Sequence, residues 1–101
     1  YVYGGTSLTN GADCSGFVMS VFANFGYSLP RVAAAQCEAS TKKDISQLEP
    51  GDLVFYGSGY IDHVALYIGD GKIIHASNAA TGIKISDYGY EKPAAVGTFM
   101  E

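Results

Sequence analysis

Cys14 stands where a cysteine can act as a nucleophile. It falls in the first turn of a predicted helix that begins at Asp13. Unpaired backbone N–H groups and the positive end of the helix dipole favour the thiolate at such a position. The alternative is a small buried apolar residue, which is the usual role of an unpaired cysteine. A nucleophilic role therefore requires a base near Cys14.

Two histidines, His63 and His75, lie in adjacent predicted strands. A nucleophilic cysteine needs a base, and the base needs a third group that fixes its tautomer and orientation. One cysteine at a helix start and two histidines in one hairpin supply these parts. The alternative is that each histidine is an isolated polar residue on a sheet face.

The loop between the two strands decides whether the histidines share a face. Side chains alternate across a strand, so a loop with an odd number of residues places His63 and His75 on one face, and a two-residue turn separates them. Gly69-Asp70-Gly71 suits a three-residue loop, in which Gly71 adopts the left-handed region and forms a bulge. Ala65 then lies opposite His75. We expect the helix that carries the cysteine to pack against the same face.

Three features offer competing chemistry. Cys37 lies inside an Ala-rich helical segment and is interpreted as a structural thiol, although a bridge to Cys14 would abolish thiolate chemistry. Asp62 precedes His63, but adjacent strand residues point to opposite faces, so a solvated turn carboxylate is favoured. Zinc is disfavoured because no Cys-x-x-Cys or His-x-x-x-His spacing occurs. No metal or other cofactor is expected.

The elements that must position these residues fall into two parts of the chain. Residues 1–12 are rich in Gly, Ser, Thr and Asn, which predicts a loop. A helix follows from Asp13 to the region of Gly26, and a short helix spans 32–39. The first of these helices is expected to bury an apolar stripe formed by Cys14, Val18, Val21, Phe22 and Phe25. Short β-branched and aromatic runs then predict strands at 53–56, 63–68, 72–76, 83–86 and 96–100. Helices packed on a C-terminal antiparallel sheet of about five strands define the α+β class.

Length and composition limit the function further. The 101 residues, 48% of them hydrophobic, predict one domain spanning 1–101. No apolar stretch approaches the ~20 residues of a membrane span, and no signal segment is evident. A net charge of -4 with scattered basic residues argues against a nucleic acid partner. Because the sequence opens with Tyr1 in a glycine-rich segment, we expect a module of a longer protein.

Short motifs recur along nearly the whole chain at ordered spacing. They read YVYGG at 1–5, GADCSGFV at 11–18, LPR at 29–31, PGDLVF at 50–55, HVALYIG at 63–69 and IHA at 74–76. In this order they resemble the NlpC-type (NlpC/p-sixty) papain-like cysteine peptidases. Each motif is modest by itself, and the ordered set makes the resemblance specific. The helix that this family carries before the first motif is missing from the sequence.

The resemblance implies a papain-like fold and a bacterial cell-wall hydrolase. Its substrate would be the stem peptide of peptidoglycan, cut typically between D-γ-glutamate and a diamino acid. Cys14 matches the nucleophile, His63 the general base and His75 the third, polar member, with a thioester as intermediate. The alternatives are an amidase or bridge-peptide hydrolase with the same Cys-His chemistry, or an inactive wall-binding module.

The resemblance also implies substrate-binding residues. Tyr1 matches a tyrosine that assists at the oxyanion or the substrate, and Asp13 and Ser15 flank the nucleophile where relatives bind the amino terminus of a trimmed stem peptide. Asp13 is equally suited to cap the helix. Arg31 is a candidate for a substrate carboxylate or a brace for the fold.

Two departures from the family pattern bear on the substrate. Tyr3 replaces a common Trp, and Val32 and Ala33 replace a Thr or Ser hydroxyl. The expected partners are the stem peptide and further wall-binding or hydrolase modules of the full-length chain. The expected location is extracellular or in the cell wall.

Overall fold

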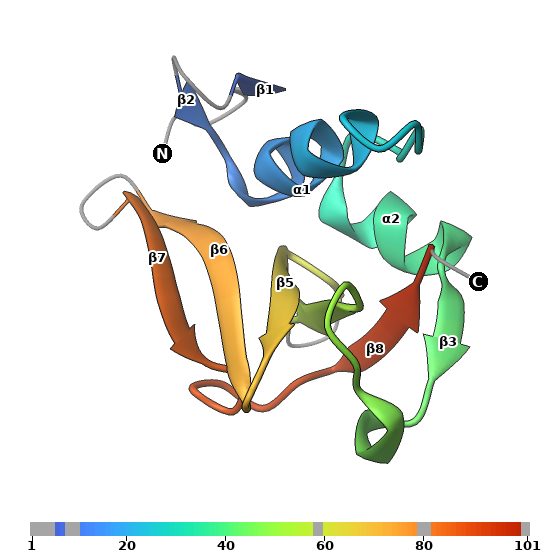
Figure 1. Cartoon of the computed structure of the whole chain (residues 1–101), viewed down its shortest axis with the longest axis vertical. Coiled ribbons are helices and arrows are strands. Elements are labelled where there is room, and N and C mark those ends of the chain that lie inside the picture. The colour runs from blue at the N-terminus through green and yellow to red at the C-terminus, as the bar shows by residue number, and fades with distance from the viewer. Residues whose placement is uncertain (1–5, 8–10, 58–59, 79–81, 100–101) are drawn as a thin grey trace.

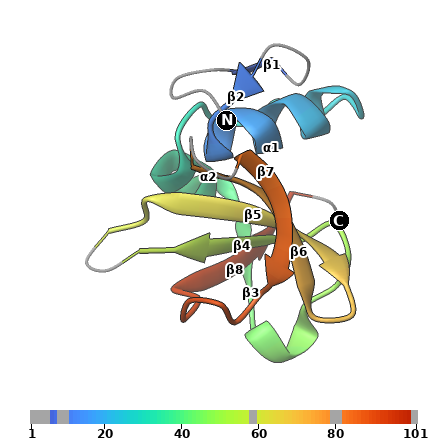
Figure 2. The ribbon, with the colours of Figure 1, turned by 90° about the vertical axis from the view of Figure 1, so that its left-hand side faces the viewer.

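The computed structural model describes residues 6–7, 11–57, 60–78 and 82–99. Two helices, α1 (Cys14–Ala23) and α2 (Ala33–Ala39), lie on one side of a six-stranded antiparallel sheet (Figures 1 and 2). Within these ranges a single 3-10 turn, η1 (Ile45–Gln47), lies between the strands at Thr41–Lys43 and Leu53–Tyr56. The α+β class, with helices first and most of the sheet second, is confirmed. None of the helices in the described ranges is long and apolar enough to cross a membrane.

The six strands follow the spatial order β3-β8-β4-β5-β6-β7. They are β3 (Thr41–Lys43), β4 (Leu53–Tyr56), β5 (His63–Gly69), β6 (Lys72–Asn78), β7 (Gly82–Asp87) and β8 (Ala95–Thr98). A separate pair, β1 (Thr6–Ser7) and β2 (Gly11–Ala12), precedes α1 where a loop was expected. All five expected strands are present within a few residues of their predicted ends. The sixth, β3, is a polar edge strand that pairs only with β8 and carries no strand-like apolar pattern.

Helix α1 begins and ends as the sequence predicts, but one of its expected core residues is exposed. The Asp13 carboxylate accepts a hydrogen bond from the backbone N–H of Gly16 (2.8 Å) and caps the helix. At the other end Gly26 has φ +85°, and the N–H of Tyr27 bonds the carbonyl of Phe22 (3.0 Å). Phe25 lies in this closing turn and is 74% exposed, so its assignment to the buried stripe was wrong.

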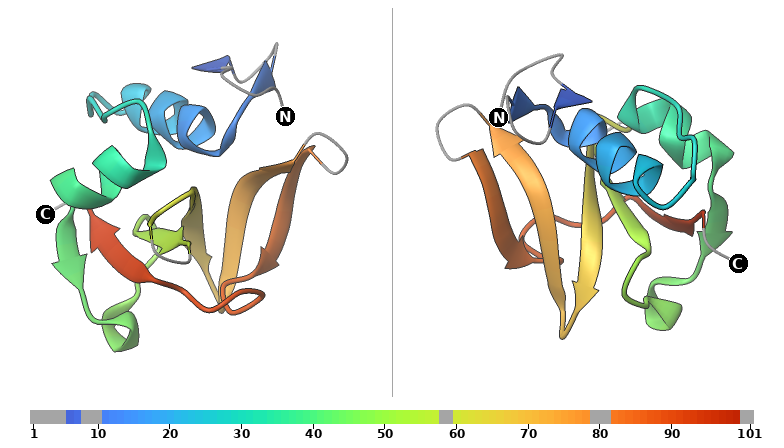
Figure 3. Two further views of the ribbon diagram at one scale, coloured as in Figure 1. Left: turned by 180° about the vertical axis from the view of Figure 1, so that it is seen from behind. Right: turned by 45° about the horizontal axis from the view of Figure 1, so that its top comes forward.

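The sheet is strongly curved (Figure 3). It buries side chains on both of its faces. Toward the helices, residues of α1 and of the sheet form one cluster: Phe17, Val18, Phe22, Leu53, Phe55, Val64 and Ala76. On the opposite face Val54, Tyr56, Ala65 and Ile73 form a second cluster, closed by Leu48, Tyr67 and Tyr88. Because β4, β5 and β6 are covered on both faces, they hold the residues at their ends firmly.

Candidate active site

Cys14 is the first residue of α1, and its thiol lies against the start of β5. Burial raises the pKa of the Cys14 thiol, and the negative charge of Asp13 adds to this effect. The backbone N–H groups of Val64, Ser15 and Cys14 itself act in the opposite direction by hydrogen bonding the sulfur. The expectation that the helix start produces a thiolate was therefore wrong for the resting protein, because desolvation outweighs the amide groups.

His63 and His75 are in direct contact. His63 Nε2 and His75 Nδ1 are 2.7 Å apart, and His75 Nε2 lies 3.1 Å from Ser86 Oγ on β7. Burial lowers the pKa of His63, although the nearby Asp62 charge raises it. Burial, His63 and Lys84 lower the pKa of the fully buried His75 to about 4. Both rings are consequently neutral near pH 7.

The turn that joins β5 to β6 differs from the expected one, yet it gives the same parity. Gly69 pairs with Lys72, so the turn consists of two residues, Asp70 (φ +54°) and Gly71 (φ +75°), as in a type I′ turn. A register shift between Tyr67 and Gly69 inserts one extra residue into β5. The bulge therefore restores the odd count that the three-residue loop was expected to provide. Gly71 has the predicted positive φ.

The packing of α1 against the sheet differs from the expectation. Side chains alternate along β5 and β6, so Val64 and Ala76 point toward α1 while the two histidines belong to the opposite face. The prediction that α1 packs on the histidine face was wrong, because the apolar side chains of α1 pack on the apolar face that contains Val64 and Ala76. Cys14, the first residue of α1, meets the start of β5, where His63 is the first residue.

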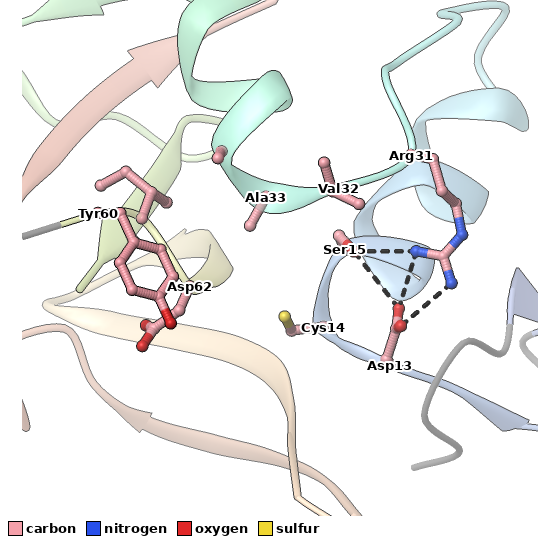
Figure 4. Close-up of a pocket in the computed structure, with 10 residues that line it drawn as sticks. Asp13, Cys14, Ser15, Arg31, Val32, Ala33, Tyr60 and Asp62 are labelled. Atoms are coloured by element: carbon pink, nitrogen blue, oxygen red, sulfur yellow. Dashed lines mark hydrogen bonds and ion pairs between the residues drawn. The ribbon is translucent and has the colours of Figure 1, made fainter.

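Asp13, Ser15 and Arg31 form one hydrogen-bonded group beside Cys14 (Figure 4). Arg31 donates from Nη1 and Nη2 to the two Asp13 oxygens (both 3.1 Å) and from Nη1 to Ser15 Oγ (3.0 Å). The bidentate pair braces residues 29–31 against the start of α1. Asp13 therefore combines its cap with an ion pair, and about a third of the Arg31 side chain (36%) stays exposed.

A fully buried amide strengthens the same corner of the molecule. Gln36 on α2 donates from Nε2 to the carbonyl oxygens of Ser15 (3.1 Å) and Pro30 (2.8 Å). Its Oε1 has no hydrogen-bond partner among the described residues. The first bond ties α2 to the first turn of α1, and the second ties it to the segment that connects the two helices. No pattern in the sequence distinguishes this glutamine from a solvated one.

A cleft of ≈ 540 Å³ opens at Cys14. Its lining comprises Asp13, Cys14, Ser15, Arg31, Val32, Ala33, Ala34, Tyr60, Ile61 and Asp62. Figure 4 shows the sulfur between two walls, with Asp13 and Arg31 on one side and Tyr60 and Asp62 on the other. Asp62 is exposed, as expected of the solvated carboxylate that the sequence favoured, and it also lines the cleft. Three of the candidate binding residues, Asp13, Ser15 and Arg31, are brought together here.

The two histidine rings and two tyrosine rings form a closed cycle of neighbouring rings. Ring centroids of Tyr56 and His63 are 5.9 Å apart, those of His63 and His75 5.0 Å, those of His75 and Tyr90 5.2 Å, and those of Tyr90 and Tyr56 5.2 Å. Tyr56 also donates its hydroxyl hydrogen bond to the carbonyl of Tyr88 (2.7 Å). Burial raises the pKa of Tyr90 to about 12, and the charges of Glu91, Cys14 and Asp62 contribute. Tyr56, Ser86 and Tyr90 could not be identified from sequence patterns, because only the fold brings them to the histidines.

The remaining candidates fall outside this arrangement. Tyr1 and Tyr3 lie outside the described residues. Cys14 and Cys37 are both free thiols, so the possible bridge between them is absent. In the part of the chain that the structure describes, no three His, Cys, Asp or Glu side chains cluster as metal ligands.

Comparison with known proteins places this geometry in a family. The chain is 49% identical over 86 residues to the probable endopeptidase p60 of Listeria innocua, covering 83% of the chain and 18% of that protein. It is 42% identical over 89 residues to the gamma-D-glutamyl-L-lysine dipeptidyl-peptidase of Bacillus subtilis, covering 84% of the chain and 30% of that protein. The chain thus spans less than a third of the length of these two curated relatives.

The fold comparison agrees with the sequence comparison. A crystal structure of an NlpC/P60 family protein from Bacillus cereus superposes with a TM-score of 0.94 at 32% identity, covering all of this chain (100%) and 35% of the other. The family model described as "NlpC/P60 family" matches residues 1–97. The chain therefore belongs to the NlpC/P60 family.

Proposed function

We propose that this domain is a cysteine peptidase that hydrolyses peptidoglycan stem peptides at the bond between D-γ-glutamate and the diamino acid. One observation carries the proposal: Cys14 opens onto a cleft at the end of β5, where His63 and His75 are 2.7 Å apart. The names of the relatives, an endopeptidase and a γ-D-glutamyl-L-lysine dipeptidyl-peptidase, support the class of substrate.

The contacts of the two histidines allow two sets of proton positions, and we assign the set that leaves an acceptor on His63 for the Cys14 thiol. Both rings are neutral, so each carries a single proton. His63 Nε2–H donates to His75 Nδ1, and His75 Nε2–H donates to Ser86 Oγ. This assignment leaves His63 Nδ1 as an acceptor. His63 is then the general base for the Cys14 thiol, and His75 is the group that fixes the tautomer and orientation of His63.

The reaction proceeds in two halves. The Cys14 proton passes to His63 Nδ1, and the thiolate attacks the γ-carbonyl carbon of the glutamate. Backbone N–H groups at the start of α1 stabilise the oxyanion. The C–N bond then breaks, and the imidazolium of His63 returns the proton to the leaving amine. Water attacks the resulting thioester, His63 accepts its proton, and the C–S bond breaks to give a carboxylic acid and the thiol.

Substrate binding is assigned to the wall of the cleft that contains Arg31. Its guanidinium directs three hydrogen bonds toward Asp13 and Ser15 and keeps further N–H groups, and Arg31 lines the cleft. These remaining donors suit the α-carboxylate of the D-glutamyl residue. We assign Asp13 and Ser15 to the substrate's amino-terminal side, and Tyr1 keeps the role that the family resemblance implies. The domain would act in the cell wall, alongside further modules of a longer chain.

Mass spectrometry of stem peptides and whole peptidoglycan digested by the purified domain tests the proposal. The expected products carry a new amino terminus on the diamino acid, and Cys14→Ala yields none. Cleavage at the amide that joins the glycan to the peptide, or within a bridge peptide, would establish the amidase or bridge-peptide alternative. Binding of peptidoglycan without any product would establish the wall-binding alternative.

A further inference from the structure

Among the described residues that line the cleft, one carboxylate has no cation to neutralise it. Its charged lining residues are Asp13, Arg31 and Asp62. Arg31 is paired with Asp13 through two hydrogen bonds of 3.1 Å. The exposed Asp62 carboxylate has no hydrogen bond or ion pair with any described residue. The unpaired charge of the cleft is therefore negative and lies at Asp62.

Asp62 lies on the side of the cleft from which the leaving group departs. Figure 4 shows Asp62 and Tyr60 across the Cys14 sulfur from Asp13 and Arg31. Asp62 directly precedes His63 and is close enough to raise the pKa of that ring against the effect of burial. In the proposed mechanism His63 protonates the leaving amine. The amino acid that carries this amine must accordingly sit on the His63 and Asp62 side.

We propose that Asp62 forms the subsite for the side-chain ammonium of the diamino acid, so that the domain prefers lysine-type stem peptides to meso-diaminopimelate. This inference rests on the proposed function. A lysine side chain ends in an ammonium group alone, which a carboxylate attracts. Diaminopimelate carries a carboxylate on the same carbon, and this group is repelled by Asp62. The Tyr60 ring, 72% exposed beside Asp62, offers an apolar surface to the methylene groups of either side chain.

The test compares two synthetic peptides, L-Ala-γ-D-Glu-L-Lys and L-Ala-γ-D-Glu-meso-diaminopimelate, at low ionic strength. We expect the wild-type domain to show the higher kcat/KM for the lysine peptide. Asp62→Asn should lower the ratio of the two kcat/KM values about three- to fivefold, and Asp62→Lys should favour the diaminopimelate peptide. Glu38→Gln, which removes one negative charge from the exposed surface of α2, is the matched control and should leave the ratio unchanged.

The ratio is the proper readout because Asp62→Asn also alters the pKa of His63, which affects both substrates equally. A ratio that is the same in wild type and Asp62→Asn, or a wild-type preference for diaminopimelate, would overturn the inference. Failure of the wild type to cleave either peptide would refute the proposed function instead. The same ratio, measured from dissociation constants of the two peptides with Cys14→Ala, then tests the subsite without catalysis.

Discussion

The two cysteines of this domain have similar thiols in very different surroundings. Both are free, and burial is the main cause that raises the pKa of each. Cys37 is 8% exposed within the apolar cluster between helices and sheet, with Lys42 and Glu38 as its charged neighbours. Cys14 opens onto the cleft and receives the backbone N–H of Val64, the residue that follows His63.

The surroundings of a thiol, and not a low pKa in the free protein, therefore distinguish the nucleophile Cys14 from Cys37. A raised pKa of Cys14 and a lowered pKa of His63 both favour the neutral thiol and the neutral imidazole in the free protein. The thiolate then forms by proton transfer to His63 when a substrate fills the cleft and the N–H groups bind the developing oxyanion. Cys37 instead has a buried thiol inside the apolar cluster, and it is not among the described residues that line the cleft.

The largest expected effect is the difference in activity between Cys14→Ala and Cys37→Ala. Cys14→Ala should lower kcat/KM at least about a thousandfold, because the attacking atom is removed. Cys37→Ala should retain most of the activity and lower the free energy of unfolding by about 1 kcal/mol, since it leaves a small cavity. Stem-peptide hydrolysis and urea unfolding measure the two quantities. Equal activity losses in the two variants would remove the distinction between the cysteines.

The second largest expected effect is a loss of stability at acid pH that originates at His75 and not at Cys37. The pKa of His75 is lowered to about 4, against an ordinary value near 6.5. The unfolded chain therefore binds the proton first as pH falls. The associated stability is complete above pH 6.5 and is lost progressively as pH falls toward 4, by about 2 kcal/mol.

Urea unfolding at pH 7 and pH 4.5 measures this loss. His75→Asn should reduce the difference between the two pH values, whereas Cys37→Ala should keep the wild-type difference. An undiminished pH dependence in His75→Asn would assign the acid sensitivity to other groups.

The third prediction concerns Gly71→Val, which disturbs the hairpin that aligns the two histidines and leaves the surroundings of Cys37 unchanged. Gly71 has φ +75°, where a β-branched side chain is strained, although a Cβ there would meet only ordinary contacts 3.9 Å from Tyr88. Gly71→Val should cost about 1–3 kcal/mol and reduce kcat/KM about tenfold. Gly89→Val is the matched control, since Gly89 has no positive φ and open space around its Cβ. Comparable losses in both variants would argue against a role for the turn.

The smallest expected effect concerns the ring that covers His75. Tyr90→Ala admits water to the histidine pair, which raises the pKa of His63 and His75 toward 6.5. Catalysis needs neutral His63, so the acid limb of the kcat/KM profile should move about half a pH unit upward. Tyr90→Phe retains the ring and should keep the wild-type profile. An unchanged acid limb in Tyr90→Ala would show that this ring does not influence the base.

The sequence predicts much of this fold because its local signals agree with the tertiary structure. The run at 53–56 becomes β4 with the same bounds, and Asp13 caps α1 as its residue type favours. The Asp-Gly pair at 70–71 marks the hairpin. Its turn type was nevertheless wrong, because the extra residue that fixes the parity lies inside β5 as a bulge. A bulge depends on the neighbouring strand and leaves no local signal.

Features formed by distant segments could not be predicted. The polar edge strand β3 exists because β8 offers it a partner. Tyr90 reaches His75 only through the fold, and Asp62 lines the cleft because α1 and β5 begin at the same place. The face on which α1 packs was also missed. Alternation gives which residues of β5 and β6 share a face, but not which face the helix covers.

Trapping the thioester tests the central claim most directly. The domain is mixed with L-Ala-γ-D-Glu-L-Lys-D-Ala, quenched in acid within milliseconds to seconds, and examined by intact and peptide mass spectrometry. The account predicts an L-Ala-γ-D-Glu acyl group on the peptide that contains Cys14, its disappearance as product forms, and an unmodified Cys37. An acyl group on Cys37, or product release by Cys14→Ala at the wild-type rate, would contradict it.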